Sequence, residues 1–221
     1  RQAGGKSAFF TMTDVQKMTH TPQSGVTAHT SRLAETPAFT DTKGIAAQQA
    51  IETLAAYGVL NGMTKTTFEP AANLTRAQFA KIVVGALNLT PEYRGTFKDV
   101  AQSAWYAPYV DTAAAYGIVN GVGDGKFEPN RNITRQEMAV IMAGYLAWKG
   151  TDTTPGTEAS AYNIADLDDI APWALESVCF CYEKGLLSGR GTGFAPLANA
   201  TRAEACVVLC GLHDFLTTSG G

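Results

Sequence analysis

The sequence predicts an all-α protein built from three helix-loop-helix repeats, and two observations support this prediction. Three short blocks occur three times in the same order from about Ala38 onward. They read YGVLNG, FEP and LTRAQFA within 57–80, YGIVNG, FEP and ITRQEMA within 116–139, and KGLLSG, FAP and ATRAEAC within 184–206. Apolar residues also recur at helical spacing inside each copy. Such repetition indicates units that cannot bury their apolar faces alone and therefore share one core.

The first helix of each repeat is expected to end at a glycine. In the second repeat this helix begins at about Trp105, and an apolar stripe runs along it as far as Ala114. A glycine followed by an apolar residue then ends the helix, which is typical of a left-handed C-cap. These glycines are Gly58, Gly117 and Gly185. A loop with a second glycine, an aromatic residue and a proline follows.

The second helix of each repeat begins with a threonine that is followed, three residues later, by glutamate or glutamine, which is the capping-box pattern. The three boxes are Thr75–Gln78, Thr134–Glu137 and Thr201–Glu204. Apolar residues follow at positions i, i+3, i+4 and i+7, so the three second helices are expected to pack together. The stripes are Phe79, Ile82, Val83 and Ala86; Met138, Ile141, Met142 and Tyr145; and Ala205, Val208, Leu209 and Leu212.

An arginine stands second in each capping box. This position lies in the first turn of the helix, where the macrodipole disfavours a cation by about 0.3–1 kcal/mol. Helix formation therefore does not explain why arginine recurs there three times.

The repeats divide the chain into five segments. These are an N-terminal extension at 1–37, repeats at 38–95, 96–160 and 161–217, and a short tail at 218–221. The linker at 149–160 is rich in threonine and glycine and is expected to be exposed. The extension is mostly polar, and only residues 9–15 are faintly strand-like.

The charge and hydropathy of the chain exclude several classes of partner. A net charge of -3 gives no general electrostatic reason to bind nucleic acid or an anionic membrane. No apolar run approaches the length of a membrane span, and the N-terminus lacks the apolar segment of a signal peptide. The chain is therefore either intracellular or a mature form whose export signal has been removed.

No motif for catalysis, metal binding or a cofactor stands out. The histidines are scattered, and GVGDGKF at 121–127 lacks the lysine and the Ser/Thr ending of a phosphate-binding loop. The acidic cluster at 166–169 lacks the glycine and the distal glutamate of a calcium-binding loop. We therefore expect a non-catalytic protein without metal or cofactor.

All four cysteines fall in the last quarter of the chain, at Cys179, Cys181, Cys206 and Cys210. Their spacing fits neither zinc ribbons nor redox motifs. We expect them to be small buried residues on helices, and one disulfide between the two helices remains open.

The order of these motifs resembles the S-layer homology (SLH) motif of bacterial surface proteins, and three such motifs resemble a complete SLH anchor. Repeat two is the most similar. Repeat one has Ala46 at the tryptophan position and Lys65-Thr66 in place of Asp-Gly, and repeat three has a shortened loop at 190–193. The matching residues of repeat two are Phe97, Asp99, Trp105, Gly117, Gly121, Asp124, Gly125, Phe127, Pro129 and Thr134 to Glu137.

This resemblance implies a fold, a function and a location. The fold would be a pseudo-threefold, three-pronged bundle with a central three-helix core. The function would be anchoring at the bacterial cell surface, in the cell wall or S-layer. The ligand would be a secondary cell-wall polysaccharide, often bearing a ketal-linked pyruvate, or another peptidoglycan-linked polymer, held in grooves between adjacent motifs.

The resemblance also implies which residues contact the ligand. An arginine fork can grip a carboxylate, a tryptophan offers an apolar face to a sugar ring, and glycine admits a close backbone approach. A core role for the tryptophans and a turn role for the glycines remain open, and we expect the site using Arg135 and Trp105 to be the principal one. The implied residues are Arg76, Arg135, Arg202, Asp41, Asp99, Asp166, Trp105, Trp173, Gly62, Gly121 and Gly189.

A second function remains open beside anchoring. Residues 1–37 could add a strand to a neighbouring subunit, and the protein would then be a structural subunit of a surface lattice or filament that self-associates through this segment.

Overall fold

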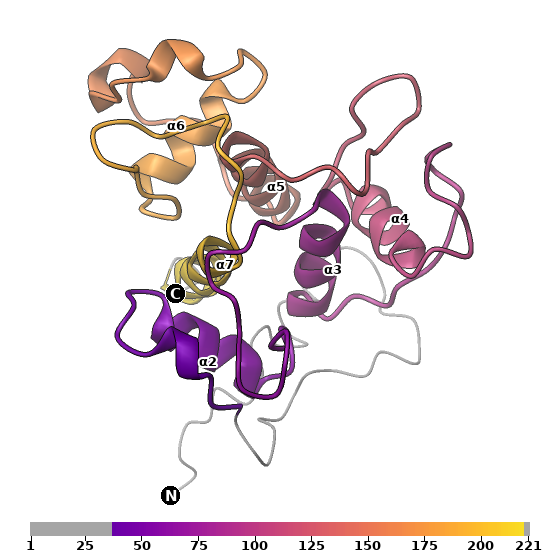
Figure 1. Ribbon diagram of the computed structural model, residues 1–221. Helices are drawn as coiled ribbons and strands as arrows, with labels where there is room; N and C mark the ends of the chain where they lie inside the picture. Colours follow the sequence, from indigo (N-terminus) through magenta and orange to yellow (C-terminus); the bar gives the residue numbers. More distant parts are fainter. Residues whose placement is uncertain (1–36, 219–221) are drawn as a thin grey trace, which may run out of the picture.

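The computed structural model describes residues 37–218, and within that range it is all-α, as predicted (Figure 1). Its ordered elements besides the helices are isolated β-bridges and short 3-10 turns, and no strand is formed in this part of the chain. The α-helices are α2 (Gln48–Ala56), α3 (Arg76–Ala86), α4 (Ala107–Ala115), α5 (Arg135–Trp148), α6 (Leu175–Glu183) and α7 (Arg202–Thr218). The 3-10 helices are η1 (Thr40–Thr42), η2 (Ala159–Tyr162) and η3 (Leu167–Asp169). The predicted assembly arm, apart from Pro37, lies outside the described residues.

The repeats interlock, because each first helix packs chiefly against the second helix of the preceding repeat. Helix α4 packs on α3, α6 packs on α5, and α2 packs on α7. The last pair closes a ring, since α2 belongs to the first repeat and α7 to the third. Figure 1 shows these pairs as three prongs around a centre where α3, α5 and α7 converge. The three-pronged arrangement is thus confirmed.

The apolar stripes predicted on the second helices form the centre of the core. Every predicted stripe residue is at most 6% exposed, and all of them belong to one continuous apolar cluster that also includes the inner faces of α2, α4 and α6. The predicted helix ends are confirmed as well. Gly58, Gly117 and Gly185 have φ values of 68°, 67° and 66°, which is the left-handed conformation that glycine adopts without strain.

A closed cycle of backbone hydrogen bonds joins the three repeats at the pseudo-threefold axis. The N–H of Leu74 donates to the carbonyl of Ala200 (3.1 Å), that of Ala200 to Ile133 (2.9 Å), and that of Ile133 back to Leu74 (2.9 Å). All three side chains are fully buried. Each residue immediately precedes a capping threonine, so the three second helices start from one shared point.

The four cysteines are free thiols on α6 and α7, and three of them are buried. The Cys181 thiol donates to the carbonyl of Ala139 on α5 (3.6 Å), and burial raises the pKa of Cys181 to about 12. Burial also raises the pKa values of Cys179, Cys206 and Cys210. The expectation of small buried residues on helices is confirmed, and no disulfide is formed.

Thiol titration checks this arrangement. In the native protein at about pH 7, a chromogenic disulfide reagent should react slowly, because the buried thiols carry little thiolate. In denaturant all four cysteines should react rapidly. A denatured total below four would show that a disulfide exists.

Candidate functional site

The three arginines of the capping boxes are buried and reach across into the next repeat. Their exposed fractions are 5% for Arg76, 2% for Arg135 and 8% for Arg202. Arg76 donates from Nε to the carbonyl of Phe127 (2.8 Å) and from Nη2 to that of Asn120 (2.9 Å). Its guanidinium carbon lies 4.6 Å from the centre of the Phe127 ring. These contacts explain why arginine follows the capping threonine.

The other two arginines repeat this geometry around the pseudo-threefold axis. Arg135 donates to the carbonyls of Phe194 (2.9 Å) and Ser188 (2.5 Å) in the third repeat. Arg202 donates to those of Phe68 (2.9 Å) and Asn61 (2.7 Å) in the first repeat. The third arginine therefore ties the end of the chain back to its first repeat. Its guanidinium carbon lies 4.3 Å from the centre of the ring in Phe68, and that of Arg135 lies 4.8 Å from the ring in Phe194.

The predicted aspartates hold the same loops from the opposite side. Asp99 accepts the backbone N–H groups of Phe127 and Glu128, each at 2.8 Å. These bonds hold Glu128 at a φ of 56°. This left-handed conformation is unfavourable in free energy for any residue that has a Cβ atom. Burial opposes ionisation of Asp99, but the two N–H groups outweigh it and hold the pKa of this carboxyl below its ordinary value.

Asp41 and Asp166 act in the same way in their own repeats. Asp41 accepts from the N–H groups of Phe68 and Glu69, and Asp166 accepts from those of Phe194 and Ala195. The peptide between each phenylalanine and the next residue is thus bound at its N–H by an aspartate of its own repeat and at its carbonyl by the arginine of the preceding one.

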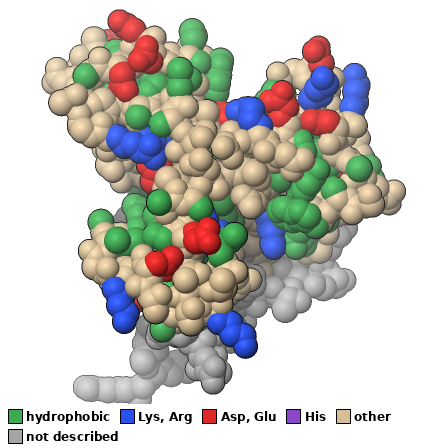
Figure 2. All heavy atoms as spheres, viewed as in Figure 1, with side chains coloured by type: hydrophobic (Ala, Val, Ile, Leu, Met, Phe, Trp, Pro, Cys, Tyr) green, Lys and Arg blue, Asp and Glu red, His purple; other side chains and the backbone are tan. Residues whose placement is uncertain are grey.

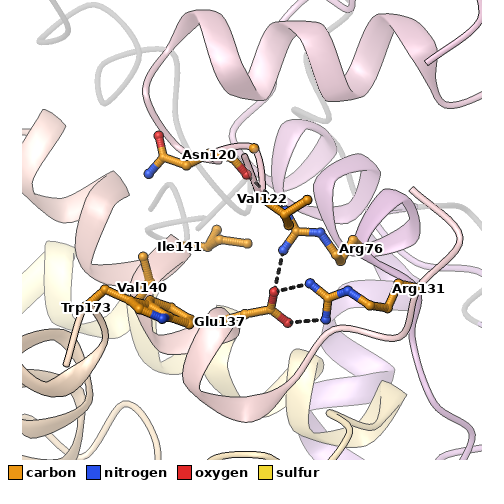
Figure 3. Close-up of a pocket in the computed structure, with 9 residues that line it drawn as sticks. Arg76, Asn120, Val122, Arg131, Glu137, Val140, Ile141 and Trp173 are labelled. Carbon is orange, nitrogen blue, oxygen red and sulfur yellow. Dashed lines mark hydrogen bonds and ion pairs between the residues drawn. The ribbon is translucent and has the colours of Figure 1, made fainter. Parts of the chain in front are cut away.

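Two of the three arginines also form ion pairs with the glutamate of the next capping box. Glu137 lies 2.7 Å from Nη1 of Arg76 and 2.6 Å from Nη2 of Arg131 (Figure 3). Glu204 pairs likewise with Arg135 and Arg190. Burial opposes ionisation of both glutamates, but the arginine and backbone hydrogen bonds hold the pKa of each below its ordinary value.

The loop glycines are required by close packing. A Cβ atom on Gly121 would lie 2.6 Å from the carbonyl oxygen of Lys126 and 2.9 Å from the ring of Phe97. On Gly189 it would lie 2.6 Å from the carbonyl oxygen of Gly193. Gly62 is equally crowded by Phe39. Packing within the loop therefore accounts for glycine at these three positions without any ligand.

The two predicted tryptophans lie on the surface and not in the core. Trp105 is 54% exposed and Trp173 is 61% exposed, which is high for so large an apolar side chain. Nζ of Lys81 on α3 lies 5.5 Å from the centre of the Trp105 ring. The core role that the sequence left open is wrong for both.

A pocket of about 530 Å³ brings together one arginine, one glycine and one tryptophan of the predicted set, and each comes from a different repeat. Figure 2 shows the three lobes with hollows between them, and Figure 3 shows Trp173 across from the Arg76–Glu137–Arg131 cluster. The pocket is lined by Arg76, Asn120, Gly121, Val122, Arg131, Glu137, Val140, Ile141 and Trp173.

The structure does not place Arg135 beside Trp105, the pair expected to form the principal site. Arg135 contacts the loop and capping box of the third repeat, whereas Trp105 lies over α3 of the first. The reason is the interlocked ring, in which an arginine meets the loop of the next repeat and the tryptophan of the one after that. For Arg135, the residue at that tryptophan position is Ala46.

The backbone at the start of each second helix is already occupied by protein. The N–H groups of Arg76 and Ala77 donate to the carbonyls of Arg131 and Pro129, and the other two helices do the same. A ligand would therefore meet arginine side chains and not a bare helix terminus.

Within the described residues, no helix is long and apolar enough to cross a membrane. Over the same range, no cluster of histidine, cysteine and acidic side chains could hold a metal ion.

The fold and the pocket define an all-α module of three interlocked repeats with a groove between them. The model of the S-layer homology domain matches residues 38–80, 96–139 and 163–206, one match for each repeat. The chain therefore belongs to the S-layer homology domain family. Modules of this family are non-catalytic and bind cell-wall polymers, and the family places the chain at the bacterial cell wall or S-layer.

Several proteins share this module. An amylopullulanase of Thermoanaerobacterium thermosulfurigenes is 37% identical over 179 residues, which are 80% of this chain and 9% of that protein. The surface-layer 125 kDa protein of Lysinibacillus sphaericus is 31% identical over 166 residues, 73% of this chain and 14% of that protein. The S-layer protein sap of Bacillus anthracis is 32% identical over 162 residues, 71% of this chain and 19% of that protein. The chain thus spans only a small part of these relatives.

Replacing Asp99 with asparagine should lower the free energy of unfolding by about 1–2 kcal/mol, because an amide cannot accept both loop N–H groups as a carboxylate does. Urea denaturation at neutral pH measures this loss. Asp124→Asn is the control, since it removes the same charge from an exposed position of the same repeat.

The pH dependence of stability gives the same variant a second readout. The pKa of Asp99 is lowered on folding, so its contribution is complete above the ordinary value of 3.8 and is lost as the pH falls through the folded-state pKa. The wild type should lose more stability than Asp99→Asn between about pH 5 and about pH 2. Parallel curves would contradict the role assigned to Asp99.

Proposed function

We propose that this chain anchors the protein that carries it to the bacterial cell wall by binding secondary cell-wall polysaccharide in the grooves between its repeats. The observation that carries this proposal is the pocket where Arg76, Gly121 and Trp173 meet. In this proposal the module binds without catalysis and needs no cofactor.

The chemistry of the pocket suits an acidic sugar, such as one bearing a pyruvate ketal. A guanidinium has five N–H donors, and the protein contacts of Arg76 use three of them, so two remain for a ligand carboxylate. Arg131 is partly exposed and adds a second cation. The exposed face of Trp173, together with Val122 and Val140, offers an apolar wall for a sugar ring.

The burial of the arginines decides which variants test this proposal. Removing Arg135 or Arg76 would leave loop carbonyls without their donor and a partly buried glutamate with only its surface arginine, at a cost of about 3–5 kcal/mol. Loss of binding by an arginine-to-alanine variant would therefore not distinguish a lost ligand contact from a destabilised fold. Trp173 is exposed, and truncating it should leave the fold intact.

A pull-down with purified cell-wall sacculi tests the proposal. The wild type should bind sacculi that retain their secondary polymer and should not bind sacculi from which the polymer has been removed. Trp173→Ala should weaken binding about five- to tenfold, because an aromatic contact contributes roughly 1–1.5 kcal/mol. Circular dichroism and the melting temperature establish that the variant is folded.

Leu197→Ala is the matched control, because Leu197 is also a large apolar residue, is 64% exposed and does not line the pocket. It should bind as the wild type does. Wild-type binding that ignores removal of the polymer would refute polysaccharide anchoring. Undiminished binding by Trp173→Ala would refute the role of this groove.

A further inference from the structure

The three inter-repeat arginines share their carbonyl partners but differ in the side chain that opposes their charge. Arg76 is opposed by Glu137 and Arg135 by Glu204. Each glutamate is held in turn by a second arginine on the surface, Arg131 or Arg190. Both buried cations are therefore compensated by a carboxylate of the protein itself.

The first repeat has glutamine at this position. The side-chain oxygen of Gln78 accepts the backbone N–H of Thr75 (2.8 Å), so glutamine completes the capping box as glutamate does elsewhere. It brings no negative charge. The substitution therefore preserves the helix start and removes only the carboxylate that would oppose Arg202.

Arg202 is consequently a buried cation without an ion pair among residues 37–218, although it is only 8% exposed. Asp41 and Glu69 act on it from a longer distance, but Arg135 and Arg76 also have such acids, Asp166 and Glu128. What distinguishes Arg202 is the missing glutamate. A buried charge is usually paired, so an anion at this position would be favourable.

A second cation stands beside this position, next to an exposed aromatic ring. Lys81 lies one turn along α3 from Gln78, where the other repeats have Val140 and Val207. Its Nζ is 5.5 Å from the ring centre of Trp105 and 5.8 Å from that of Tyr109. In the ring of repeats, Trp105 occupies the same position relative to Arg202 as Trp173 occupies relative to Arg76. We call Arg202, Gln78, Lys81 and Trp105 the Arg202 cluster.

We propose that the Arg202 cluster is the groove that recognises the carboxylate of the cell-wall polymer, and that Gln78 and Lys81 determine this specificity. The carboxylate, as carried by a pyruvate ketal, takes the place of the glutamate that the first repeat lacks. The two self-compensated grooves bind the charged sugar more weakly, because a glutamate already opposes each of their arginines. This inference rests on the proposed function and adds which groove selects the charged sugar.

Indole N–H signals in a proton–nitrogen NMR spectrum resolve the grooves, because the chain has only three tryptophans. Trp105 reports on the Arg202 cluster, Trp173 on the Arg76 pocket, and Trp148 on neither. The probe is a methyl glycoside carrying a pyruvate ketal, and its comparison is the same glycoside with a neutral ethylidene acetal. The charged probe should shift the Trp105 signal at a concentration at least about tenfold lower than the neutral one.

Gln78→Glu is the decisive variant, because it gives Arg202 the carboxylate that the other two arginines have. The capping box accepts either residue, so the fold should be retained. The affinity reported by Trp105 for the charged probe should fall at least about tenfold, and affinity for the neutral probe should stay the same. Lys81→Val should also lower the affinity that Trp105 reports for the charged probe.

Glu137→Gln is the matched reciprocal variant, because it removes the carboxylate opposite Arg76. The Trp173 signal should then respond to the charged probe at a lower concentration than in the wild type. If Gln78→Glu leaves the Trp105 titration unchanged, or if both probes bind alike, the inference is wrong. Polymer-dependent binding of sacculi would still stand in that case, whereas its loss in the wild type would overturn the proposed function.

Discussion

The fold depends on one peptide unit in each loop that is bound from both sides. In the second repeat this unit is the peptide between Phe127 and Glu128. Asp99 accepts from the N–H of Glu128, and the carbonyl of Phe127 accepts from the buried Arg76 of the preceding repeat. Hydrogen bonds to a charged group contribute about 1.5–3 kcal/mol, roughly twice a neutral one. Because the same contact occurs three times around a closed ring, each repeat is held by both of its neighbours, and none can complete its core alone.

The recurrence of arginine in the first turn of a helix, which local helix energetics disfavours, follows from this contact. It also limits how the arginines can serve a ligand, since most of their donors are committed to the protein. The grooves therefore differ in the residues that surround each arginine. The last position of the capping box carries a glutamate or a glutamine, and the position three residues later carries a valine or a lysine. The tryptophan position carries a tryptophan or Ala46. The structural contact is the same in all three repeats, whereas these neighbouring positions differ between them.

The repeats, the helix caps and the apolar stripes could be predicted from the sequence because each rests on local spacing. The partner of each helix could not, because helical periodicity shows which face is buried but not which repeat covers it. For that reason Arg135 and Trp105 were expected together, although the ring order separates them. The pairing of Arg76 with Glu137 could not be predicted for the same reason, because the capping box alone already accounts for a glutamate at that position. The replacement of that glutamate by Gln78 is visible in the sequence, but it acquires meaning only once the ion pairs of Arg76 and Arg135 at the equivalent position are known.

A double-mutant cycle between Arg76 and Asp99 tests most directly whether the shared peptide joins the repeats. No ion pair connects these two side chains in the described part of the chain, and they belong to different repeats. Unfolding free energies of Arg76→Met, Asp99→Asn and the double variant should reveal a coupling of at least about 0.5 kcal/mol. The cycle of Arg76→Met with Asp41→Asn, whose loop is held by Arg202, should stay within about 0.3 kcal/mol of additivity. Additive effects in both cycles would contradict the account.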